Sequence, residues 1–227
     1  MTPRTATGII RLALAATGVV ALVARFLWAF GSVTFSSDNF FAYLTIQSNI
    51  AFVVVMILAG VRALRTGFDP VWLTTARATV LACILVAGIV FALLVQQAGV
   101  RAYRIDVPWS DQILHFVLPV LALIEWLAAP GRGRAKPRAV LSALVYPVLW
   151  GVVTIIRGPL VGWYPYFFLD PAQVSGFLEF ALISALALTL FCTLSAGIVL
   201  CTRARPFGER MHQRRHRHRV AEIPLGE

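Results

Sequence analysis

The stretch from Ala78 to Gly99 reads ATVLACILVAGIVFALLVQQAG and contains no charged residue. A helix needs about 20 apolar residues to cross a bilayer core, and a buried strand is far shorter than this run. The stretch therefore predicts a transmembrane helix. Five further runs of similar length and apolar character occur along the chain, at Gly8–Gly31, Phe40–Val61, Asp111–Ala129, Ala139–Ile156 and Ser175–Cys201.

The composition supports a membrane protein. The chain has 227 residues, of which 59% are hydrophobic and 13% are charged, whereas a soluble domain carries about 25% charged residues. The apolar content also excludes an intrinsically disordered chain. We predict an all-α fold, an integral six-helix transmembrane bundle over residues 1–202, followed by a basic cytoplasmic tail over residues 203–227.

The distribution of lysine and arginine predicts the orientation. If the N-terminus is cytoplasmic, sixteen basic residues lie in cytoplasmic segments and only Arg101, Arg104 and Arg157 lie in the outer loops. By the positive-inside rule both termini are cytoplasmic, and we expect a multi-pass protein of the cytoplasmic membrane. Because the arginines lie between and after apolar runs, the net charge of +10 does not indicate nucleic-acid binding. We expect the tail to contact anionic lipid headgroups.

Two polar residues lie at matching depth on two predicted helices. Thr45 and His115 each follow the outer start of a span by one helical turn, roughly 6–8 Å below the surface. His115 is the only histidine outside the tail, which excludes a multi-histidine metal centre within the membrane. We therefore expect no metal and no organic cofactor.

The residue types at this depth suit acyl transfer. A histidine serves as a general base, and a threonine becomes a nucleophile when a base takes its proton. Asp111 precedes His115 by one turn. It is a candidate to orient the imidazole, and its negative charge is also favoured at a helix N-terminus by the helix dipole, a role compatible with the first. Thr45 alone is also typical of a helix threonine that bonds back to a carbonyl. Asn49, in a polar stretch with Ser48, is a candidate donor to an oxyanion.

Other charged residues have structural and functional interpretations. Arg25 and Arg157 are expected to form ion pairs with acidic residues on the same side of the membrane, namely Glu179, Asp38, Asp111 or Asp170. Alternatively, Arg157 holds a carboxylate or headgroup of a substrate. Glu125 is expected on the opposite side of the membrane, paired with loop arginines.

The outer loop at residues 158–170 is rich in aromatic residues, which are favoured at the headgroup level. The loop is expected to anchor the protein at the interface, to cover the entrance for an acyl chain, or to do both. The four residues that we assign to this substrate entrance are Trp163, Tyr164, Tyr166 and Phe168.

Three segments, in order, resemble motifs of the androgen-induced membrane protein family, which includes the androgen-dependent regulator of tissue factor pathway inhibitor. Tyr43–Ile46 resembles its Y-L-T-F stretch. His115–Pro119 with Leu123–Glu125 resembles H-T-T-V-L-P-F-I-L-I-E, with one residue fewer after the histidine, and Gly162–Asp170 resembles the G-x-W-x-Y-P-F-L-E loop. The likeness covers residues 40–200, and the abundance of Ala, Val and Arg indicates a bacterial member.

The resemblance implies a six-span threonine hydrolase that cleaves fatty acid esters of hydroxy fatty acids, with Thr45 as nucleophile and His115 as base. The family's acidic residue three positions after its threonine is Ser48 here, and its histidines near the end of the fifth span are Ile156 and Arg157. The first departure argues against a fixed third catalytic residue, and the second favours a different substrate headgroup. The expected partners are membrane lipids and a lipid ester substrate. The alternative function is non-catalytic, as a small transporter, a lipid-binding protein or an assembly factor.

Overall fold

The computed structural model describes residues 2–33, 35–66, 68–100, 106–204 and 206, and every regular element among them is helical. Six of its helical segments are long and apolar enough to cross a membrane, so the prediction of a multi-pass, all-helical membrane protein is confirmed. Five of them are single helices, and the fourth along the chain joins α5, the π-helix η1 and α6. The segments are α1 (Pro3–Phe30), α3 (Leu44–Arg65), α4 (Val71–Val100), α5 (Trp109–Gln112) with η1 (Ile113–Val117) and α6 (Leu118–Ala128), α7 (Arg138–Val161) and α8 (Phe177–Cys201).

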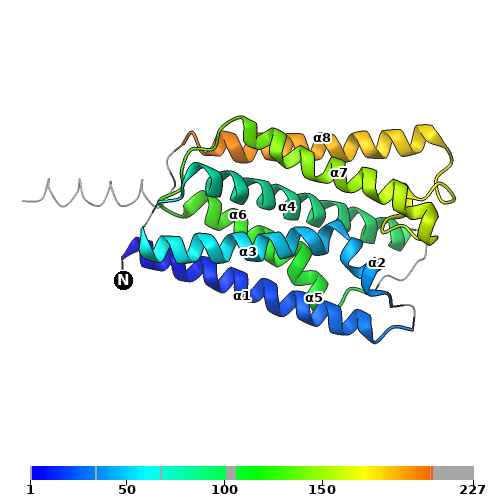
Figure 1. The fold of residues 1–227 in the computed structure, drawn as a ribbon, viewed down its shortest axis with the longest axis horizontal. Helices are drawn as coiled ribbons and strands as arrows, with labels where there is room; N and C mark the ends of the chain where they lie inside the picture. Colours follow the sequence, from blue (N-terminus) through cyan, green and yellow to red (C-terminus); the bar gives the residue numbers. More distant parts are fainter. Residues whose placement is uncertain (1, 34, 67, 101–105, 205, 207–227) are drawn as a thin grey trace, which may run out of the picture.

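The helices run side by side, and α4 lies at the centre of the bundle (Figure 1). It packs against α3, α6, α7 and α8, while α1 packs mainly against α3. The start of α1 and the end of α8 lie at one end of the bundle, which we call the terminal end. The short helix α2 (Ser37–Ala42) lies at the other end, which we call the α2 end. Most of the basic tail predicted for residues 203–227, like Arg101 and Arg104, lies outside the described residues.

Close packing of α1 on α3 depends on glycine. A Cβ atom on Gly8 would lie 2.7 Å from the side chain of Leu64, and one on Gly60 would lie 2.8 Å from the side chain of Leu12. Small residues of this kind let two helix backbones approach, which is a common basis of helix association in membranes.

Several helix boundaries differ from the predicted spans. α1 begins at Pro3 because Thr2 caps it and proline is tolerated in a first turn. The predicted second span is wrong at its start: Phe40 belongs to α2, and extended backbone at Tyr43 separates α2 from α3. α4 begins seven residues before Ala78, and Arg77 therefore lies inside a helix of the bundle.

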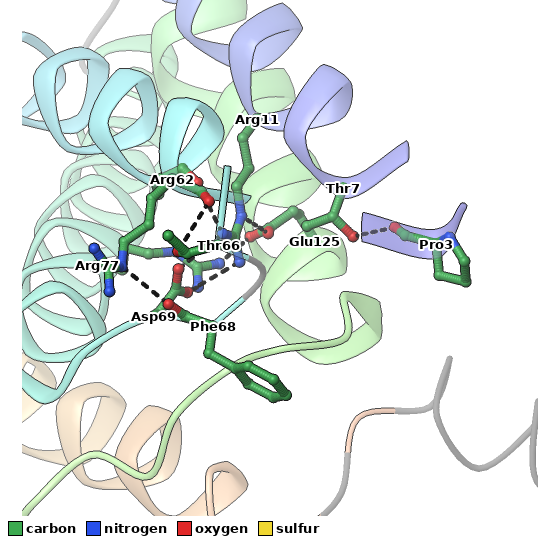
Figure 2. Close-up of polar contacts among 10 residues, drawn as sticks. Pro3, Thr7, Arg11, Arg62, Thr66, Phe68, Asp69, Arg77 and Glu125 are labelled. Carbon is green, nitrogen blue, oxygen red and sulfur yellow. Dashed lines mark hydrogen bonds and ion pairs between the residues drawn. The ribbon is translucent and has the colours of Figure 1, made fainter. Parts of the chain in front are cut away.

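Arg77 belongs to a ring of four buried charges near the terminal end (Figure 2). Arg11 donates to Asp69 (Nη1 to Oδ1, 3.0 Å) and to Glu125 (Nε to Oε1, 2.7 Å). Arg77 also donates to both acids, at 2.5 Å for Nη2 to Oε2 of Glu125. No side chain in this charge ring is more than 4% exposed.

The charge ring joins α1, the α3–α4 connection, α4 and α6. Each acid contacts both arginines, so the four formal charges cancel within the ring. Removing one partner from a buried arrangement of this kind leaves an uncompensated charge and is strongly destabilising. Glu125 therefore pairs with arginines, as predicted, but these arginines lie on two helices, α1 and α4, and not in loops.

Candidate functional site

A mostly apolar cavity of about 240 Å³ lies among α3, α4, α7, α8 and the loop that connects α7 to α8. Thr45 of α3, His115 of η1 and Tyr166 of the loop contribute polar groups to it, and α8 contributes Ser184. The cavity is partly open, and some of its lining residues on α7 and α8 are also exposed on the outer surface, namely Val148, Val152, Ile155 and Leu188. Its walls therefore continue onto apolar faces that can contact lipid chains.

The hydroxyl of Thr45 does not bond back to its own helix. Five other helix threonines donate to the carbonyl four residues earlier, namely Thr7, Thr17, Thr75, Thr189 and Thr193. Thr45 lies in the first turn of α3, directly after the break at Tyr43, so no carbonyl of the same helix lies four residues before it. Its Oγ1 atom instead lies 3.4 Å from the hydroxyl oxygen of Tyr166. The break between α2 and α3 thus leaves this hydroxyl available to the cavity.

Ser48 and Asn49 act on the backbone of Thr45. The Ser48 hydroxyl and the Asn49 amide both donate to the Thr45 carbonyl, at 3.1 and 2.9 Å. Both side chains are buried, and neither lines the cavity. The geometry therefore contradicts a role of Asn49 as oxyanion donor, and it gives both residues the task of fixing the first turn of α3.

His115 lies in η1, the π-helical turn within the fourth span. Its Nδ1 atom is 3.0 Å from the backbone oxygen of Asp111. Because a carbonyl oxygen only accepts, Nδ1 must carry the proton, and Nε2 keeps its lone pair. A neutral imidazole in this tautomer has the form required of a general base.

The Asp111 side chain does not complete a triad with His115. Its carboxylate lies 4.0 Å from Nδ1 of His115, whereas it lies 2.8 Å from Nε of Arg25. The predicted ion pair between Arg25 and Asp111 is therefore confirmed. The predicted orienting role is corrected, because the backbone of Asp111, rather than its side chain, holds the imidazole.

The helix α4 fixes the imidazole from its other side. The Phe91 ring stacks on the His115 ring with centroids 3.8 Å apart and planes 13° apart. One turn earlier, Gly88 lets α4 approach η1, since a Cβ atom there would lie 2.2 Å from the backbone oxygen of His115. A π-bulge in this position is typical of functional sites, and neither it nor the stacking was predicted.

Only some of the aromatic side chains in the loop between α7 and α8 line the cavity. Tyr166 and Phe168 line it. Tyr164 instead packs on Gly158, where a Cβ atom would lie 2.0 Å from its ring. Trp163 packs edge-on against Tyr43. Neither Trp163 nor Tyr164 lines the cavity, in contrast to the other two residues assigned to the entrance.

Arg157 lies outside the cavity. Its Nη2 atom donates to Oδ1 of Asn39 at 2.7 Å, and its guanidinium lies over the ring of Trp163. This hydrogen bond connects the end of α7 to α2. Arg157 was predicted to pair with an acidic residue, and its partner here is the amide of Asn39 instead. Glu179 accepts from the backbone and the hydroxyl of Ser175.

The side chains of Thr45 and His115 both line the cavity but are not hydrogen-bonded to each other. Within the described part of the chain, no hydrogen bond joins the two side chains, although both line the same space. In the same part of the chain, His, Cys, Asp and Glu side chains form no group of three that could hold a metal ion.

No protein-family model, curated protein or solved structure matches this chain. The fold and the site therefore define its class by themselves. The chain is a multi-pass membrane protein, and its apolar cavity brings together a threonine, a histidine and a tyrosine.

Proposed function

We propose that the chain is a membrane-embedded hydrolase of lipid esters, with Thr45 as nucleophile and His115 as general base. The observation that carries the proposal is the shared cavity: a threonine hydroxyl not bonded to its own helix and an imidazole in the accepting tautomer line one apolar space. The apolar walls suit acyl chains. The resemblance to the androgen-induced membrane protein family assigns the same two residues to ester cleavage.

The proposed reaction has two steps. Nε2 of His115 takes the proton of Thr45 while Oγ1 attacks the ester carbonyl carbon, and the alkoxide leaves as an alcohol with the proton returned by His115. Water, deprotonated by the same imidazole, then attacks the acyl-threonine and releases the fatty acid and the free hydroxyl. No metal or organic cofactor takes part in either step.

The proposed location is the cytoplasmic membrane of a bacterium, with both termini in the cytoplasm. This orientation rests on the excess of basic residues in the segments at the terminal end. It places the cavity toward the outer leaflet. The substrate then arrives from the membrane lipids, and the basic tail contacts anionic headgroups.

The alternative proposal is a non-catalytic lipid-binding protein, which the apolar, partly open cavity favours. A transport path that uses Glu125 has less support, because both oxygens of that carboxylate are held by Arg11 and Arg77. An activated nucleophile is what distinguishes the hydrolase from the lipid-binding protein.

The test is labelling of the purified full chain with a lipid-like fluorophosphonate. We expect labelling of the wild type and its loss in Thr45→Ala and His115→Ala. The matched control is Thr154→Ala, since Thr154 is a buried threonine outside the cavity lining. Equal labelling of all variants would place the reactive residue elsewhere, and no labelling of folded wild type would favour the lipid-binding protein.

A further inference from the structure

The hydroxyl of Tyr166 lies next to the proposed reacting atom. Its oxygen is 3.4 Å from Oγ1 of Thr45, and its side chain lines the cavity. During attack, the carbonyl oxygen of the ester and Oγ1 would be bonded to the same carbon. A donor at this distance from Oγ1 is therefore within reach of the position where negative charge develops.

The ring of Tyr166 is held on several sides. It stacks on Phe168 with centroids 5.5 Å apart and planes 4° apart, and it contacts Trp150 and Tyr43 edge-on at 5.8 and 5.9 Å. A ring fixed in this way loses little conformational freedom when substrate arrives. Preorganised donors are effective because they need no rearrangement as the reaction proceeds.

The hydroxyl also remains a donor over the ordinary pH range. Burial raises the pKa of Tyr166 to about 12, because a phenolate loses hydration in this environment. The side-chain donor that the sequence suggested for the oxyanion, Asn49, is occupied by the Thr45 carbonyl. Among the described residues, Ser184 of α8 also lines the cavity but makes no hydrogen bond to Thr45, whereas the Tyr166 hydroxyl lies 3.4 Å from Oγ1.

We infer that Tyr166 is a catalytic residue of the proposed hydrolase, whose hydroxyl donates a hydrogen bond to the ester carbonyl and to the oxyanion formed when Thr45 attacks. This inference rests on the proposed function. The phenol keeps its proton throughout, and the charge on the oxyanion returns to form the carbonyl when the alcohol leaves. Tyr166 is thus part of the reacting centre and not only of the substrate entrance.

The experiment compares wild type, Thr45→Ala, Tyr166→Phe and Tyr146→Phe in hydrolysis of a long-chain p-nitrophenyl ester by the full chain in detergent. Tyr146→Phe is the matched control, because it removes a hydroxyl that bonds to Gln47 outside the cavity lining. We expect Tyr166→Phe to lower kcat by about 10²–10³-fold with little change in KM, as for other oxyanion donors. Tyr146→Phe should keep the wild-type kcat.

A second measurement separates transition-state stabilisation from shape. A long-chain trifluoromethyl ketone forms an oxyanion on the nucleophile, whereas the corresponding ether cannot. Tyr166→Phe should weaken binding of the ketone by about the factor lost in kcat and leave binding of the ether unchanged. If Tyr166→Phe does not fold, a ring-fluorinated tyrosine at this position keeps the shape and lowers the phenol pKa. The basic limb of the pH–rate profile should then move to lower pH.

The outcomes distinguish the inference from the function on which it rests. Loss of turnover in Thr45→Ala with wild-type kcat in Tyr166→Phe would overturn the inference and leave the hydrolase standing. A raised KM with unchanged kcat in Tyr166→Phe, or an unmoved pH profile in the fluorinated protein, would also overturn it. Full turnover in Thr45→Ala would overturn the proposed function and the inference together.

Discussion

His115 is held by the backbone of Asp111: its Nδ1 atom lies 3.0 Å from the Asp111 carbonyl oxygen and 4.0 Å from the Asp111 carboxylate. A backbone acceptor sets the tautomer of the imidazole without adding a charge beside it. The carboxylate is left to Arg25, on α1, so one residue orients the proposed base and ties a second helix to it.

This arrangement predicts a mild effect of Asp111→Asn on catalysis. A true triad loses about 10⁴-fold in kcat when its aspartate becomes asparagine, because the tautomer is lost. Here the backbone bond remains, so we expect kcat to fall by less than about tenfold, while the melting temperature falls because Arg25 loses its ion pair. Steady-state kinetics and thermal unfolding of the purified variant measure both. A fall in kcat close to 10⁴-fold would show instead that the Asp111 carboxylate takes part in catalysis.

Gly88→Ala should damage the site through the backbone. The added Cβ would lie 2.2 Å from the His115 carbonyl oxygen, so α4 and η1 must separate. Overpacking of this kind costs about 1–3 kcal/mol or more, and we expect both a lower melting temperature and lower turnover. Gly197→Ala is the control, because nothing lies within 4 Å of its added Cβ. Equal behaviour of the two variants would show that the approach of α4 to η1 is unimportant.

Glu125→Gln should destabilise the bundle without changing its chemistry. The substitution leaves Arg11 and Arg77 with an uncompensated charge, and breaking a buried ion pair costs about 3–5 kcal/mol. Thermal unfolding in detergent measures the loss, with Glu179→Gln as a control outside the charge ring. Combining Glu125→Gln with Arg77→Met should cost less than the sum of the two single changes. Additive losses would mean that the ring residues do not interact.

Ala187→Phe should change substrate length preference. Ala187 lines the cavity from α8, so a phenyl group there occupies space that we assign to an acyl chain. We expect KM for long-chain esters to rise while short-chain esters are little affected. Ala185→Phe, on the same helix but outside the cavity lining, is the matched control. The same chain-length profile in both variants would remove the cavity from the proposed substrate path.

The six spans followed from the sequence because uncharged runs of this length have few other stable forms. The helix boundaries were predicted less accurately where a charged residue was taken to mark the end of a span. The predicted span began at Ala78, yet Arg77 lies inside α4, where Asp69 and Glu125 neutralise its charge. Asp69 itself went unnoticed. A signal was present, since Arg11, Arg77 and Glu125 all fall near the same membrane boundary.

The pairing of Thr45 with His115 was predicted from depth alone, and the structure places both at one cavity. Their hydrogen bonds could not be predicted, because they depend on a helix break at Tyr43 and on a π-helical turn. The position of Tyr166 depends on the path of a loop, which carries no periodicity. Likewise, Trp163 and Tyr164 belong to the same aromatic loop as Tyr166, but they pack against Tyr43 and Gly158 instead of lining the cavity.

The charge ring bears on the biogenesis of the protein. From the N-terminus onward, Arg11, Asp69, Arg77 and Glu125 alternate in sign. As the chain leaves the ribosome, each new ring residue is opposite in charge to the one before it, so at most one ring charge at a time lacks a counterpart. An ionised side chain is costly inside a bilayer. The order of these four residues thus limits that cost while later helices are still being made.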